Sequence, residues 1–344
     1  MQTIQKEIKE RIFLCDQKGR LNPESIGWAR LPHHTCNLKG AWMRKKRWDY
    51  WTVVNGKHLF SAAFAHLDYA VLAFVHLLDM ESGEFFEHSV IKKMPSAKEF
   101  TLPNSAGEEV FFDFEGLRMN FQPDAKGTML RVDCAQFQGS PLTAEILVLA
   151  PKAQESLNIV APWSKRRFQF SSQQNCLPAQ GRVEWGGRVV DFKKTGKNPS
   201  FAALDFGRGV WPFQTAWQRA GFAGKCGRDV LGLNMGAHWT DETGMNENGY
   251  CLNGKLFKIF DGMTFDFNPE NYMAPWKVRT RSSEAVMLEF NPIHHHPVEH
   301  KVAFLQAQTH RVFGRWSGEV KVGGRKTLAV KELPGWVEDF QARW

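Results

Sequence analysis

Ionisable side chains gather most densely between residues 205 and 250 of the 344-residue chain. Asp205 and Arg208 lie in the segment LDFGRGVWP, and His238 and Glu242 follow in the segment NMGAHWTDE. Carboxyl and imidazole groups can hold and transfer protons, so Asp205, Glu242 and His238 are the candidate catalytic residues. The glycines on both sides of Arg208 predict a turn that lets a ligand approach the backbone.

Aromatic side chains accompany these groups. The chain contains 13 Trp and 27 Phe but only 4 Tyr, which predicts either a large aromatic core or a cavity lined with rings. We expect Asp205, Arg208, His238 and Glu242 to meet at the mouth of a β-barrel, where rings bind an apolar ligand. The candidate ligand-binding residues are Arg208, Trp211, Trp217, Asn234, Trp239, Trp48, Tyr50, His66 and Asp68.

Two pairs of these residues, Asp205 with Arg208 and His66 with Asp68, can also have purely structural roles. Asp205 and Arg208 can form a salt bridge that pins a loop and takes no part in chemistry. His66 and Asp68 face the same side if they lie on a strand. If that side faces a cavity, they form a His–carboxylate pair that could orient a ligand or move a proton, and if it faces solvent they have no role. For an interior position, a structural hydrogen bond is favoured over catalysis.

Motifs for nucleotides and metals give weaker signals. Gly207 and Gly209 lack the strand-to-helix context of a dinucleotide site. His294–His296 with His300 resembles a metal-binding tract, but adjacent histidines on an extended chain point in opposite directions, which favours a structural loop. We therefore expect no cofactor and no metal.

Basic residues cluster in front of aromatic ones. Arg44–Arg47 precedes Trp48, and Lys165–Arg167 precedes Phe168. Such runs can bind single-stranded nucleic acid or an anionic headgroup, or can simply solvate the start of a strand. With 36 acidic residues against 44 basic ones, we expect no nucleic acid partner. The expected partner is a hydrophobic small molecule or lipid, which could carry an anionic end.

Short turn-bounded segments recur along the chain. Trp48–Val54 and Leu59–Ala65 flank Asn55-Gly56, a strong hairpin signal, and a similar turn is predicted at Gly186-Gly187. This rhythm predicts an all-β, mainly antiparallel protein. We expect two lipocalin-like β-barrels or sandwiches, at residues 1–170 and 171–344, with a short C-terminal helix over Gly335–Trp344.

The location of the protein is predicted from what the sequence lacks. No apolar run reaches the ~18 residues that span a bilayer, and the N-terminus does not resemble a secretory signal. The six cysteines form no CxxC pair. We expect reduced thiols and a cytoplasmic protein.

Several of these segments resemble one protein family over nearly the whole chain. RWDYW at Arg47–Trp51, LDYA at Leu67–Ala70 and above all LDFGRGVWP at Leu204–Pro212 are similar to bacterial proteins grouped as domain of unknown function 2804. A more distant similarity links the chain to carotenoid-hydratase-like and AttH-like proteins. That resemblance implies two lipocalin-like barrels and, for some members, action on isoprenoids or other apolar molecules.

Three hypotheses about function follow. The first is a protein that binds a hydrophobic small molecule or lipid. The second is a hydratase, lyase or cyclase, in which buried Asp205 or Glu242 protonates an olefin and aromatic faces stabilise the cation. The third is a glycosidase, which requires two carboxyl groups roughly 5–10 Å apart across a cleft.

Overall fold

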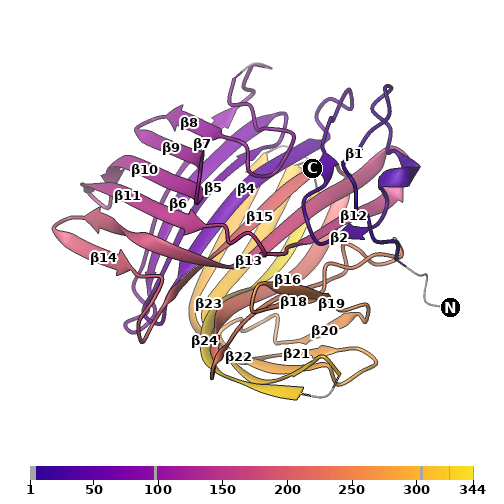
Figure 1. Ribbon diagram of the computed structural model, residues 1–344. Helices are drawn as coiled ribbons and strands as arrows, with labels where there is room; N and C mark the ends of the chain where they lie inside the picture. Colours follow the sequence, from indigo (N-terminus) through magenta and orange to yellow (C-terminus); the bar gives the residue numbers. More distant parts are fainter. Residues whose placement is uncertain (1–4, 97–98, 303–304, 325, 344) are drawn as a thin grey trace. The chain divides into compact units, whose positions relative to one another are not determined.

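The computed structural model describes residues 5–96, 99–302, 305–324 and 326–343 (Figure 1). The chain divides into two compact units: a large unit, Lys6–Trp211, and a small unit, Pro212–Trp344, to which Gln5 also belongs. The boundary predicted between residues 170 and 171 lies inside a strand of the large unit. Among the described residues, no helix is long and apolar enough to cross a membrane.

The large unit is a mainly antiparallel sheet that curves into a nearly closed barrel. Its main path runs β7-β6-β5-β4-β15-β13-β11-β10-β9-β8, and β7 also lies against β10. Its elements are β1 (Ile12–Phe13), η1 (Pro23–Ser25), β2 (Trp28–Ala29), β3 (His34–Thr35), β4 (Lys45–Val54), β5 (His58–His66), β6 (Ala70–Asp79), β7 (Phe85–Lys93), β8 (Val110–Phe114), β9 (Leu117–Asp124), β10 (Gly127–Phe137), β11 (Ser140–Leu149), β12 (Leu157–Ser164), β13 (Arg167–Trp185), β14 (Arg188–Phe192) and β15 (Ser200–Val210).

Turn chemistry explains the hairpins. The side chain of Asn55 accepts hydrogen bonds from the backbone N–H groups of Lys57 and His58, both at 2.8 Å, and so closes the β4–β5 hairpin. Gly186 and Gly187 both have positive φ, 54° and 77°, as a two-residue turn between antiparallel strands requires. Both predicted hairpins are confirmed.

The inner face of this sheet carries the hydrophobic core. Alternate residues of β4 and β15, such as Trp51, Val53, Leu204 and Phe206, belong to one buried cluster with side chains from nearly every strand of the unit. The side chains between them point to the opposite face. That face of β4, β13 and β15 carries the polar and aromatic residues described below.

The small unit is a single antiparallel sheet of half-barrel form. Its order is β19-β18-β17-β16-β24-β23-β22-β21-β20, around a separate core that includes Trp276 and Trp316. Its strands are β16 (Gln214–Cys226), β17 (Asp229–Ala237), β18 (Gly249–Leu252), β19 (Lys255–Lys258), β20 (Met263–Asp266), β21 (Trp276–Thr280), β22 (Val286–Val302), β23 (Leu305–Val322) and β24 (Lys326–Arg343).

The predicted C-terminal helix is wrong. Residues up to Arg343 form the last part of β24, which pairs with β16 on one side and β23 on the other, while Trp344 lies outside the described residues. Val337 packs into the core, and Glu338 and Asp339 both bind side chains of neighbouring strands. Pairing on both edges satisfies this backbone, so tertiary context overrides local helix preference.

The six cysteines, all within the described residues, are free and buried. Burial raises the pKa of the Cys226 thiol to about 11, with a smaller contribution from Asp229. A thiol with a raised pKa is a poor nucleophile, which fits a packing role.

Candidate functional site

Asp205 lies in the middle of β15, on the face opposite the core. Its neighbours Leu204 and Phe206 point into the core, so alternation directs the half-buried carboxyl outward. In the register of the sheet, Asp205 is directly opposite Tyr50 of β4 and Gln173 of β13. Three strands far apart in sequence therefore bring these three side chains onto one face.

Two side chains orient the Asp205 carboxyl. The indole N–H of Trp48 and the side-chain amide of Gln173 donate to its Oδ1 atom, at 3.0 Å and 2.8 Å. Donors aimed at a carboxylate make stronger hydrogen bonds than donors aimed at a neutral acceptor. The carboxyl is thus held in one orientation beside the Trp48 ring.

The glycines of LDFGRGVWP make room for this arrangement. A Cβ atom at Gly207 would lie 2.1 Å from the Trp48 ring, and one at Gly209 would lie 2.0 Å from Oε1 of Gln169. The turn predicted here is wrong, because residues 200–210 form a continuous strand. The glycines instead let the side chains of neighbouring strands lie flat across β15.

Further rings extend the cluster. The Trp211 ring meets the edge of Trp48 at 5.9 Å and contacts Trp163 at 5.2 Å, while its indole N–H donates to Gln169 at 2.7 Å. Tyr50 packs edge-on against Phe74 at 5.4 Å. The sequence-predicted residues Asp205, Trp48, Tyr50 and Trp211 therefore come together; with Gln173 they are called the Asp205 cluster.

Arg208 does not pair with Asp205, which corrects that structural interpretation. Residues three apart on a strand point to opposite faces, so Arg208 lies fully buried on the core side. Its guanidinium donates to Asp49 Oδ1 at 2.6 Å and to the backbone oxygens of Trp48, Pro103 and Gly207. Burial raises the pKa of Asp49, and the Arg208 charge opposes that rise.

His66 is the last residue of β5 and Asp68 lies in the turn after it, so the two residues do not share a strand. Strand β5 ends at His66, and Asp68 has a positive φ of 69°. The Asp68 backbone N–H donates to Nδ1 of His66 at 3.1 Å, while its carboxylate binds the Lys45 ammonium at 2.9 Å. Burial lowers the pKa of His66, with a further contribution from Arg47.

In the small unit, Asn234 and Trp239 converge on a residue that the sequence analysis missed. Glu247 is fully buried; it accepts the Trp239 indole N–H at 2.5 Å and lies 3.1 Å from Nε of Arg219. The Asn234 amide donates to the Glu247 backbone oxygen at 2.6 Å. A Cβ at Gly236 would lie 2.3 Å from the Glu247 carboxylate. The sequence feature that could have pointed to Glu247 is the polar run Asn246-Glu247-Asn248, which lies within the segment richest in ionisable residues.

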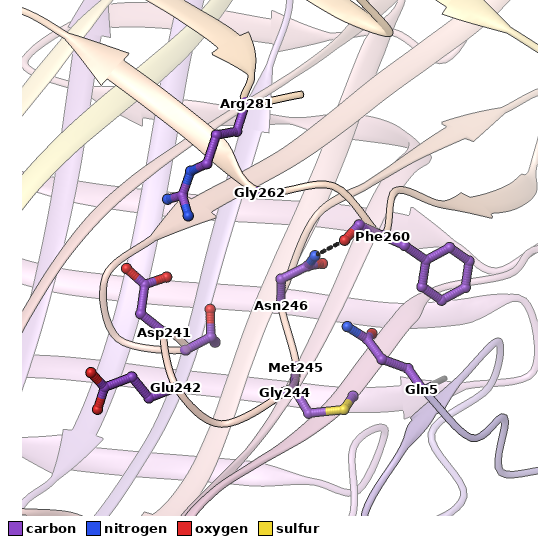
Figure 2. A pocket seen from close by; sticks show the side chains of 10 residues that line it. Gln5, Asp241, Glu242, Gly244, Met245, Asn246, Phe260, Gly262 and Arg281 are labelled. Atoms are coloured by element: carbon purple, nitrogen blue, oxygen red, sulfur yellow. Dashed lines mark hydrogen bonds between the residues drawn. The ribbon is translucent and has the colours of Figure 1, made fainter. Parts of the chain in front are cut away.

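A surface pocket of about 490 Å³ lies next to this region (Figure 2). Glu242 lines it, and Figure 2 shows Asp241 and the guanidinium of Arg281 directed toward the same space. His238 is exposed, with its Nδ1 atom 3.9 Å from Asp241. The lining is completed by Gln5, Thr240, Gly244, Met245, Asn246, Phe260 and Gly262.

Lys258 fixes one wall of the pocket. Its ammonium donates to Oδ1 of Asn246 and to the backbone oxygens of Asn248, at 3.2 Å, and Ile259, at 2.9 Å. Burial lowers its pKa to about 7, and the charge of Glu247 acts against that shift. Because Asn246 lines the pocket, this lysine positions the wall.

Trp217 binds a third carboxylate. Its indole N–H donates to Glu338 at 2.8 Å, and its ring stacks on Phe340 at 3.6 Å. Arg311 donates to the other carboxylate oxygen through Nε, at 2.9 Å.

A second cluster that the sequence analysis missed lies on the core side of β24. The Asp339 carboxylate accepts the Tyr272 hydroxyl at 2.8 Å and the Gln218 amide at 2.6 Å. Tyr272 stacks on His310 at 4.0 Å, and His310 is hydrogen-bonded to His295 at 3.0 Å. Burial raises the pKa of Tyr272 and lowers those of both histidines.

The histidine tract belongs to a strand, which corrects the predicted loop. His294–His296 and His300 lie within β22. Of these, His295 joins the Tyr272 stack. Because side chains alternate along a strand, His295 points to the opposite face from His294 and His296.

The fold and the clusters together define an all-β protein in which rings and carboxylates share the same strand faces. The chain belongs to the family described as Domain of unknown function (DUF2804), whose model matches residues 5–344. No curated protein matches the chain.

Solved structures with a similar fold are known. A protein designated AttH from Nitrosomonas europaea is 13% identical, with a TM-score of 0.51 over 86% of this chain and 92% of that one. Kievitone hydratase from Nectria haematococca is 8% identical, with a TM-score of 0.47 over 86% and 88%. CghA with Sch210972 is 9% identical, with a TM-score of 0.44 over 87% and 88%. At 13% identity, the likeness to the AttH structure shows the fold alone.

Proposed function

We propose that this protein binds a hydrophobic small molecule or lipid on the aromatic face of the large unit, with Asp205 receiving its polar end. The observation that carries the proposal is the convergence of Trp48 and Tyr50 from β4 with Asp205 from β15 and Trp211 just after it. Rings supply apolar area with a defined shape, and one oriented polar group fixes the direction of a ligand.

The core of the large unit indicates which face of the sheet holds the ligand. Its inner side is occupied by buried apolar side chains, including Phe60, Phe64 and Phe206. The outward face of β4, β13 and β15 instead combines rings with a carboxylate. We therefore place the ligand on the outward face.

The polar end is best matched by a hydrogen-bond donor. The Asp205 carboxylate is an acceptor, and Trp48 and Gln173 both reach Oδ1, which sets its orientation. Of the basic run before Trp48, Lys45 binds Asp68 and Lys46 donates to the Leu67 backbone. An anionic end, expected from the sequence, is therefore the alternative outcome of the experiment.

Two fluorescent probes separate these outcomes. N-phenylnaphthylamine is neutral and carries an N–H donor, whereas anilinonaphthalene sulfonate adds an anionic group. We expect Asp205→Asn to weaken binding of the neutral dye about tenfold, because a charge-assisted hydrogen bond contributes roughly 1.5–3 kcal/mol. Asp133→Asn, an exposed carboxylate on β10, is the matched control and leaves the affinity unchanged.

The titration has clear opposing outcomes. Equal affinity of the wild type and Asp205→Asn for the neutral dye rules out Asp205 as the anchor. Preferential binding of the sulfonate dye that survives Asp205→Asn assigns the polar end to basic residues instead.

Acid catalysis at Asp205 is the second candidate function. The Trp48 ring beside the carboxyl favours it, because an aromatic face stabilises a nearby carbocation. Conversion of an isoprenoid-type olefin by the wild type, lost in Asp205→Asn while dye affinity is retained, identifies an enzyme. No conversion by the wild type leaves binding as the function.

A further inference from the structure

An exposed tryptophan projects from one end of the large unit. Trp42 is 70% exposed, in a loop where Ala41 and Met43 both have positive φ, 44° and 68°. The Arg44 backbone N–H donates to the Ala41 oxygen at 3.0 Å and closes this turn. A Cβ on Gly40 would meet nothing within 4 Å, so the loop reaches into open space.

Two further loops lie at the same end. The backbone N–H of Leu21 donates to the Lys165 oxygen at 2.9 Å, and a Cβ on Gly19 would lie 2.8 Å from the Lys39 oxygen. The sheet register agrees, because Val210 of β15 is opposite both Lys45 and Phe168. Loops 16–21, 39–44 and 164–167 therefore form one surface, called the Trp42 end.

The Trp42 end is strongly basic. Its acidic side chain, Asp16, is already paired with Arg20 at 3.1 Å. Lys45 and Lys46 stabilise the strand start behind it, through Asp68 and the face of Tyr69. The basic side chains of the three loops are Lys18, Arg20, Lys39, Arg44, Lys165, Arg166 and Arg167.

We propose that the Trp42 end docks on the surface of an anionic lipid membrane. An indole at a projecting tip is suited to the interface between headgroups and acyl chains, where an amphipathic ring is most stable. Lysines and arginines around it are attracted to the negative potential of anionic lipids. In this mode the three loops bind at the membrane surface.

The arrangement fits a membrane better than a nucleic acid. Single strands bind along a groove in which several rings stack on successive bases. Here one ring stands at the tip, and the charges surround it on three loops. Binding to an oligonucleotide is therefore the opposing outcome of the test.

The purpose of docking rests on the proposed function, which is to bind a hydrophobic ligand at the Asp205 cluster. Trp163, Trp211 and Trp48 form a chain of ring contacts at 5.2 Å and 5.9 Å that leads from the strand ends toward Asp205. The backbone N–H of Trp211 also donates to the Arg44 oxygen at 3.0 Å. The strands that end at the Trp42 end also carry the Asp205 cluster. A hydrophobic ligand taken from a bilayer at the Trp42 end could therefore reach that cluster along the same strands.

Vesicle co-sedimentation tests the proposal with the full-length chain. The probes are vesicles of phosphatidylcholine alone and of phosphatidylcholine with phosphatidylserine. We expect binding to the anionic vesicles only, reduced about tenfold by Trp42→Ala. Replacing Lys165 and Arg166 together by alanine should reduce it roughly 25-fold, at about fivefold for each charge.

Matched controls keep the test specific. Lys193→Ala with Lys194→Ala removes two exposed charges beside the opposite end of β15 and should leave vesicle binding unchanged. Phe111→Ala removes an exposed ring from β8 and should also have no effect. Asp205→Asn should still bind vesicles, so loss of the dye site and loss of docking are separate results.

Three results would overturn the proposal: equal binding to neutral vesicles, full binding by Trp42→Ala, or tighter binding of a fluorescent single-stranded oligonucleotide than of anionic vesicles. A blue shift of tryptophan emission on vesicle binding, absent in Trp42→Ala, is the expected supporting signal.

Discussion

At the scale of single residues, the recurring device is an indole N–H that donates to a carboxylate. Trp48 holds Asp205, Trp217 holds Glu338 and Trp239 holds Glu247, at 3.0, 2.8 and 2.5 Å. The sequence predicted rings near acids but not these pairs. Trp48 and Asp205 are 157 residues apart, so only the strand register brings them together.

Gly207 provides the sharpest test of how the Asp205 cluster is built. Gly207→Ala places a methyl group in the volume of the Trp48 ring and should destabilise the protein by about 1–3 kcal/mol. In the background of Trp48→Ala, the same substitution should cost much less, because the collision is gone. Chemical denaturation of the wild type, the two single variants and the double variant measures this coupling. Additive effects would show that the two residues act independently.

At the scale of elements, the sequence predicted those strands whose signals are local. Asn55 and the Gly186-Gly187 pair define hairpins through their own backbone and side-chain geometry, and both were confirmed. The segments at residues 204–210 and 335–343 were misread as a turn and a helix. Both are inner strands whose stability comes from partners on each side, which no local pattern reveals.

Burial of His34 on β3 predicts how stability depends on pH. The ring lies tilted against Phe170, with centroids 4.7 Å apart, and is hydrogen-bonded to the Ser25 backbone oxygen at 2.9 Å. Burial lowers its pKa to about 4 from 6.5. Between these values the unfolded chain binds a proton that the folded protein does not. Stability is therefore lost as pH falls from about 6.5 to 4, by about 3 kcal/mol.

Denaturation midpoints across this pH range check the effect. His34→Gln should be less stable at neutral pH but show a shallower decline on acidification. An unchanged slope in the variant would assign the acid sensitivity to other groups.

At the scale of the whole molecule, the aromatic excess serves several purposes. Trp51, Trp276 and Trp316 are core residues, whereas Trp42 is exposed and Trp48 binds a carboxylate. The large unit holds both the Asp205 cluster and the basic Trp42 end, and the small unit holds its own core and pocket. The composition predicted that rings matter but could not distribute them among these roles.

Several of the basic residues behind the net charge of +8 are likewise concentrated at one surface. Basic side chains of three loops gather at the Trp42 end, while others pair within the fold, as Arg208 does with Asp49. The general balance of charges therefore understates the local field at this surface.

Native mass spectrometry of the purified full-length protein tests the central claim most directly. The account predicts a hydrophobic molecule bound to the wild type and to Asp133→Asn, and its loss from Asp205→Asn and Trp48→Ala, with all four proteins folded. A wild type that carries no such molecule and takes up none when lipid extract is added would contradict the account. So would a molecule retained equally by all four proteins.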